Sequence, residues 1–129
     1  MPPEAQARIV VGYSARAEGR AALTRALSEA RLRDAALIVV NTSPDAEAAG
    51  LLEELTASGL GYEIKTATDA QDSAEELIRT AETAEADFIV IGLRRRSPVG
   101  KLLLGSNAQR VLLDAACPVL AVKAEPETD

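Results

Sequence analysis

The chain has 129 residues, a formal net charge of −6 and 47% hydrophobic residues, which fits one globular domain and argues against wholesale disorder. Histidine is absent and Cys117 is the only cysteine, which excludes a serine–histidine triad, a histidine-ligated zinc site and an internal disulfide. Because aromatic residues make up only 2% and acids outnumber bases, we expect an aliphatic core and no nucleic-acid partner.

Short apolar runs, mostly of β-branched residues, predict the strands of a buried sheet. In chain order, the predicted strands cover residues 8–12, 37–40, 62–66, 88–92 and 118–122. The run at 62–66 alternates apolar and polar residues, which is typical of a half-exposed strand at the edge of a sheet.

Helical patterns fill the segments between these strands. The first predicted helix covers residues 15–32, where alanine and leucine recur at helical spacing. The second follows Ser43, an N-cap with proline after it, and stops near Gly59. The third and fourth helix starts are predicted from two capping-box patterns, Asp72 with Glu75 and Ser106 with Gln109.

The alternation of strands and helices predicts a single three-layer α/β/α domain over residues 1–129, with a Rossmann-like five-stranded parallel sheet. The polar ends, residues 1–7 and 124–129, are expected to be flexible tails. The first residues lack the pattern of a secretory signal, and no apolar run approaches the ~20 residues of a membrane span. We therefore expect a cytoplasmic protein with no membrane partner.

The loop with the most distinctive composition follows the fourth predicted strand. Ligands of open α/β sheets bind beyond the carboxyl ends of the strands. Residues 92–107 hold three adjacent arginines, a lysine and three glycines, which is a basic island in an acidic chain. Glycine admits a phosphate closely and arginine pairs with its oxygens, so the loop predicts an anion site. It is not a P-loop, because Arg95 stands where the first glycine belongs, and no G-x-G-x-x-G follows the first strand.

This loop resembles the signature of the universal stress proteins, which is Gly, two residues, Gly, nine residues, and Gly followed by Ser or Thr. Gly92, Arg95, Gly105 and Ser106 stand at those positions with the spacing intact, and Arg95 replaces the second glycine. The first strand and helix and the segment 117–122 also resemble that family. The resemblance covers nearly the whole chain and implies the universal stress protein fold.

The resemblance further implies that ATP or AMP binds at this end of the sheet, with no metal held by the protein alone. The implied nucleotide-binding residues are Gly12, Tyr13, Ser14, Thr42, Ile91, Gly92, Arg94, Arg95, Gly105, Ser106 and Asn107. Two departures from the family pattern bear on this expectation. Ser14 stands where the family has an aspartate, and Arg95 either blocks the phosphate path or supplies a phosphate contact.

These patterns are compatible with two functions and disfavour a third. The first is a stress-response protein that binds a nucleotide, with at most weak ATP hydrolysis and no catalytic residues. The second is a homodimeric interaction module that has lost the nucleotide and pairs through the strand at 118–123. The third, a receiver-like phosphoacceptor, is disfavoured because Tyr13 and Ser14 stand where acids are needed.

Overall fold

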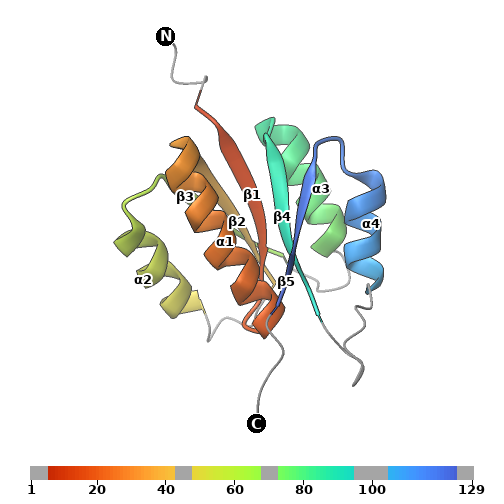
Figure 1. Ribbon diagram of the computed structural model, residues 1–129, viewed down its shortest axis with the longest axis horizontal. Helices are drawn as coiled ribbons and strands as arrows, with labels where there is room; N and C mark the ends of the chain where they lie inside the picture. The colour runs from red at the N-terminus through yellow and green to blue at the C-terminus, as the bar shows by residue number, and fades with distance from the viewer. Residues whose placement is uncertain (1–5, 43–47, 68–72, 95–104, 125–129) are drawn as a thin grey trace.

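The computed structural model describes residues 6–42, 48–67, 73–94 and 105–124, and it confirms the predicted order of strands and helices. The elements are β1 (Arg8–Tyr13), α1 (Ala17–Arg33), β2 (Ala36–Asn41), α2 (Ala48–Ser58), β3 (Tyr62–Thr66), α3 (Ser73–Ala84), β4 (Phe88–Leu93), α4 (Ser106–Asp114) and β5 (Val119–Lys123). Together they form the expected three-layer α/β/α fold (Figure 1).

All five strands are parallel and lie in the spatial order β3-β2-β1-β4-β5. The central strand is β1, where Val11 pairs with Val39 of β2 on one side and with Val90 of β4 on the other. The strand order therefore reverses between β1 and β4, and a switch point lies at their carboxyl ends. As its alternating pattern predicted, β3 lies at an edge, and β5 forms the opposite edge.

Both faces of the sheet are covered. Helices α1 and α2 pack on one face, and α3 and α4 pack on the other (Figure 1). Along β1, Ile9 and Val11 belong to the first apolar layer and Val10 to the second. Because each central strand is buried from both sides, its sequence is a continuous β-branched run and not an alternating one. The side chains of Ala22 and Ala26 are fully buried on α1, and their small size lets the helix lie close to the sheet.

The end of α2 is as predicted. Its last residue is Ser58, and Gly59 follows with a φ of 77°, the left-handed conformation that glycine adopts at helix ends. The helix starts predicted at Ser43 and Asp72 fall outside the described residues.

The start of α4 differs from the predicted capping box. Its N-cap is Gly105, and Ser106 is already the first helical residue. The Gln109 N–H donates to the Gly105 carbonyl at 3.0 Å, which is the first hydrogen bond of the helix. The helix thus begins one position earlier than the capping pattern requires, and no side chain caps it within the described part of the chain.

Candidate functional site

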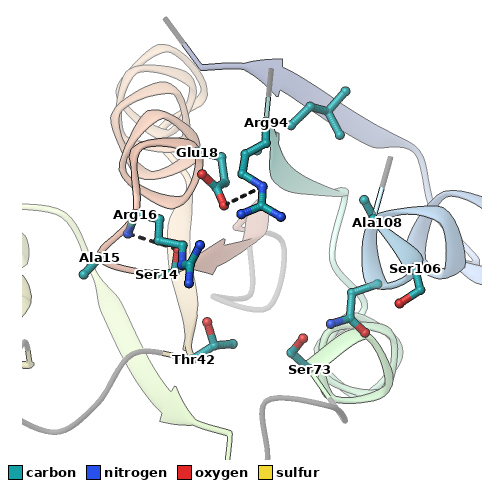
Figure 2. Close-up of a pocket in the computed structure, with 13 residues that line it drawn as sticks. Ser14, Ala15, Arg16, Glu18, Thr42, Ser73, Arg94, Ser106 and Ala108 are labelled. Atoms are coloured by element: carbon teal, nitrogen blue, oxygen red, sulfur yellow. Dashed lines mark hydrogen bonds and ion pairs between the residues drawn. The ribbon is translucent and has the colours of Figure 1, made fainter. Parts of the chain in front are cut away.

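A cleft of about 790 Å³ opens at the switch point of the sheet (Figure 2). Its walls come from the loop between β1 and α1, the ends of β2 and β4, and the first residues of α3 and α4. The described residues that line it are Ser14, Ala15, Arg16, Glu18, Thr42, Ser73, Gly92, Leu93, Arg94, Gly105, Ser106, Asn107 and Ala108. A volume of this size is typical of small-molecule and cofactor sites.

A smaller space of about 180 Å³ shares lining residues with this cleft and forms its floor. The floor is bounded by Gly12, Leu77, Ile91 and Val111, which belong to the strands and helices of the fold's interior. The site therefore combines a polar mouth with an apolar floor, as sites for small organic ligands usually do.

Three helices begin at this cleft, because residues at the starts of α1, α3 and α4 all line it. The backbone N–H groups at helix starts attract anions, and the helix dipole adds to the attraction. The first turn of α1 holds Glu18, and that of α3 holds Glu75 and Glu76, whereas the first turn of α4 holds no acid. The start of α4, at Gly105, is therefore the most favourable of the three for a negatively charged group.

Two glycines fix the first turn of α1 against the sheet. A Cβ at Gly92 would overlap the carbonyl oxygen of Glu18 and lie 2.5 Å from its carbonyl carbon. A Cβ at Gly19 would overlap the backbone N and the Oγ of Ser14. Gly92 lines the cleft, but the space left by its missing side chain is filled by α1. The missing side chain therefore allows α1 to pack closely, and the nucleotide-binding role of Gly92 stays a prediction.

Two charged side chains of the mouth, Glu18 and Arg94, lie next to each other. Figure 2 shows the Glu18 carboxylate pointing toward Arg94, and their Oε2 and Nε atoms are 3.8 Å apart. Arg16 lies at the rim and is exposed. The hydroxyl of Thr42 donates to the Tyr13 carbonyl at 3.0 Å, which fixes the end of β2 beside the end of β1.

The structure brings nearly all the predicted binding residues to this cleft. Those at the mouth are Ser14, Thr42, Gly92, Arg94, Gly105, Ser106 and Asn107, and those at the floor are Gly12, Tyr13 and Ile91. The side chains of Tyr13 and Ile91 are buried in opposite apolar layers, so neither is free to turn into the mouth. Arg95 falls outside the described residues, as do Arg96 and Lys101.

Arg16, Glu18 and Ser73 also line the cleft, and sequence reasoning did not assign them to the site. The sequence positions of Arg16 and Glu18 could have indicated them, because both residues lie at the start of the helix that follows a switch-point strand. The meeting of Glu18 with Arg94 depends on tertiary packing, which sequence spacing does not report.

The described residues form no group of three or more His, Cys, Asp or Glu that could hold a metal ion. Within the same residues, no helix is long and apolar enough to cross a membrane. Cys117 lies before β5, and burial raises the pKa of its thiol, which favours the unreactive protonated form.

A parallel sheet with a cleft at its switch point places the chain in the class of doubly wound α/β proteins. The family model for the universal stress protein family matches residues 46–123. A universal stress protein of Mycolicibacterium smegmatis is 45% identical in a match that covers 89% of this chain and 96% of that protein. The chain belongs to the universal stress protein family.

Solved structures agree with this assignment. A universal stress protein from Archaeoglobus fulgidus superimposes with a TM-score of 0.69 at 29% identity, over 92% of this chain and 98% of that one. A structure of the universal stress protein from the same organism in complex with dAMP superimposes with a TM-score of 0.64 at 23% identity, with the same coverage. At that lower identity, the second likeness shows the fold alone.

Proposed function

We propose that this universal stress protein binds an adenine nucleotide, ATP or AMP, in the cleft at the switch point. The observation that carries the proposal is the start of α4. Its N-cap is Gly105, its first turn holds no acid, and no side chain of the described residues caps it. Arg94 lines the same cleft. A helix start and an arginine that line one cleft can supply the backbone donors and the positive charge that bind phosphate.

The rest of the cleft suits the rest of a nucleotide. Hydroxyl groups of Ser14, Thr42 and Ser73 line the mouth and can exchange hydrogen bonds with a ribose. The apolar floor beside Leu77 and Val111 suits part of a base. The structure of a relative with dAMP supports the idea that this fold can hold a nucleotide. The proposal concerns binding and assigns no hydrolysis to this chain.

The sharpest test is Gly105→Asp, which should change binding and stability in opposite directions. Gly105 is exposed with an extended φ of −69°, and an added Cβ meets no atom within 4 Å, so the variant should fold. Aspartate is a favourable N-cap because its charge complements the positive end of the helix dipole, and we expect the free energy of unfolding to rise by about 1 kcal/mol. The same carboxylate would occupy the phosphate position and should abolish binding of AMP and ATP.

Two control variants separate charge from space. Gly105→Ala adds a methyl group without charge into open space and should keep most of the affinity. Arg94→Gln removes a charged phosphate contact and should weaken AMP binding at least about tenfold. Calorimetric titration at physiological salt measures the AMP affinity of the unmodified chain and of the three variants. If Gly105→Asp binds AMP as tightly as the unmodified chain, the phosphate does not bind at α4 and the proposal is wrong.

We also propose that the chain forms a homodimer through β5. This strand is an edge of the sheet, and its residues Val119, Leu120, Ala121 and Val122 are all only partly buried within one chain. An unpaired edge with apolar side chains on both faces is suited to a second copy. Sedimentation of the chain and of Ala121→Pro, which removes a backbone donor from the strand, tests this. A monomer mass for the unmodified chain at high concentration would contradict the proposal.

A further inference from the structure

One acid lies within the cleft that a nucleotide would enter. Among the described residues of the mouth and the floor, Glu18 is the only carboxylate. Its side chain is 20% exposed, so it is mostly enclosed by the walls of the cleft. A negative charge in this position opposes the binding of an anion.

The position of Glu18 is fixed by the fold. Its backbone carbonyl lies against Gly92, where even one added methyl group would overlap it. The next residue, Gly19, is also packed closely against Ser14. The first turn of α1 therefore cannot move away from the cleft without losing this packing, and the carboxylate must stay near any ligand that enters.

Arg94 is held only loosely by Glu18. Their closest atoms are 3.8 Å apart, which is too long for a hydrogen bond. Arg94 is 40% exposed, and it makes no hydrogen bond within the described residues that would saturate its guanidinium. A phosphate group can bind this guanidinium, and the bound phosphate group then lies next to the Glu18 carboxylate.

We propose that Glu18 is a specificity-determining residue that biases the cleft against ligands with many phosphate charges. The inference rests on the proposed function, in which a nucleotide phosphate binds beside Arg94. Among the described lining residues, Arg94 and the exposed Arg16 each supply one positive charge, and Arg94 alone offsets about half of the charge of one terminal phosphate group. Each further phosphate adds negative charge near the fixed carboxylate, and repulsion in a partly enclosed cleft is screened less than on an open surface. The bias therefore favours a nucleoside monophosphate over a triphosphate.

The test compares AMP and ATP binding to the unmodified chain and to Glu18→Gln. Glutamine keeps the size and one acceptor oxygen, removes the charge and replaces the second oxygen with an NH2 donor. Titrations are done without divalent cations, because a bound metal ion would neutralise the phosphate charges. We expect Glu18→Gln to bind ATP about tenfold more tightly and AMP about threefold more tightly, so that the ratio of ATP to AMP affinity rises about threefold.

Glu82→Gln is the matched control. Glu82 lies in the last turns of α3, is exposed, and forms no ion pair within the described residues, so this variant changes the net charge equally without touching the cleft. We expect its ratio of ATP to AMP affinity to match that of the unmodified chain.

The outcomes separate the two proposals. If AMP and ATP bind and Glu18→Gln leaves their affinity ratio unchanged or lowers it, the role of Glu18 is wrong while the proposed function stands. If Glu82→Gln shifts the ratio as much as Glu18→Gln, net charge and not Glu18 sets the bias, and the inference is again overturned. If neither nucleotide binds at millimolar concentration, the proposed function fails, and this inference fails with it.

Discussion

Replacing Gly92 with alanine should destabilise the fold, because the first turn of α1 occupies the space of the missing side chain. The added Cβ would overlap the Glu18 carbonyl oxygen and lie 2.5 Å from its carbonyl carbon, whereas ordinary contacts begin at 3.4 Å. Relief requires α1 to move by at least about 0.9 Å, the difference between these two distances for the carbonyl carbon, and by more for the carbonyl oxygen, which overlaps the added Cβ more deeply. The obstructing atoms are backbone, so no rotamer change can remove the overlap.

The start of α1 cannot shift freely, since Gly19 is also in close contact with Ser14. Overpacking of a core typically costs about 1–3 kcal/mol, and a backbone obstruction places Gly92→Ala near 3 kcal/mol. For a chain of 129 residues, that loss lowers the midpoint of thermal unfolding by roughly 10 °C. A total stability of about 5–15 kcal/mol leaves the variant folded at room temperature, so it can be measured.

Urea unfolding of Gly92→Ala and of Gly50→Ala measures the effect against a matched control. Gly50 lies in α2, is exposed, and an added Cβ there meets no atom within 4 Å. Gly50→Ala should therefore raise the free energy of unfolding by about 0.5–1 kcal/mol, through the better helix propensity of alanine. The packing argument is refuted if Gly92→Ala unfolds within about 0.5 kcal/mol of the unmodified chain.

Two further predictions concern stability. Glu85 is exposed and has a φ of 54°, a left-handed conformation that costs a residue with a side chain about 1–2 kcal/mol. Glu85→Gly removes this strain but gives the unfolded chain more freedom, so the free energy of unfolding should rise by about 0.5–1 kcal/mol. An unchanged midpoint of urea unfolding would contradict this. Hydrogen bonds from Arg25 at 2.9 Å and Arg33 at 3.1 Å lower the pKa of Glu29 below its ordinary value of 4.5. The carboxylate therefore stabilises the fold above that value, and this stability is lost as the pH falls through the lowered pKa. Urea unfolding from pH 7 to pH 3 should show a smaller acid loss in Glu29→Gln than in the unmodified chain, and equal losses would contradict the assignment.

Much of this fold could be predicted from its sequence because the sheet is buried on both faces. Strands covered by helices on both sides are continuous β-branched runs, as in β1 and β4, and they stand out from the helical spacing between them. The edge position of β3 followed from its alternating pattern. These signals are local, and they need no knowledge of which strands are neighbours.

The details of the site depend on contacts that local patterns do not contain. The sequence predicted that Gly92 lets a phosphate group come close to the backbone. Which atoms fill the space of its missing side chain depends on where α1 packs. Ser106 was expected to cap α4, and a shift of one position made Gly105 the N-cap. Helix boundaries are uncertain by about that much in sequence patterns, yet one position decides whether a hydroxyl caps the helix. The meeting of Glu18 with Arg94 joins residues from separate elements and has no local signature.

The most direct measurement of the central proposal is a titration of the ¹⁵N-labelled chain with AMP, followed by the amide signals of each residue. If the phosphate binds at the start of α4, the amides of Ser106 and Asn107 should shift most and saturate together with that of Thr42. A groove of about 380 Å³ is lined by residues of α1 and α2, among them Arg20 and Glu54, and it shares Tyr13 with the floor of the cleft; its other lining residues provide an internal comparison. Saturating shifts confined to that groove, or no saturating shift at millimolar AMP, would contradict binding at the cleft.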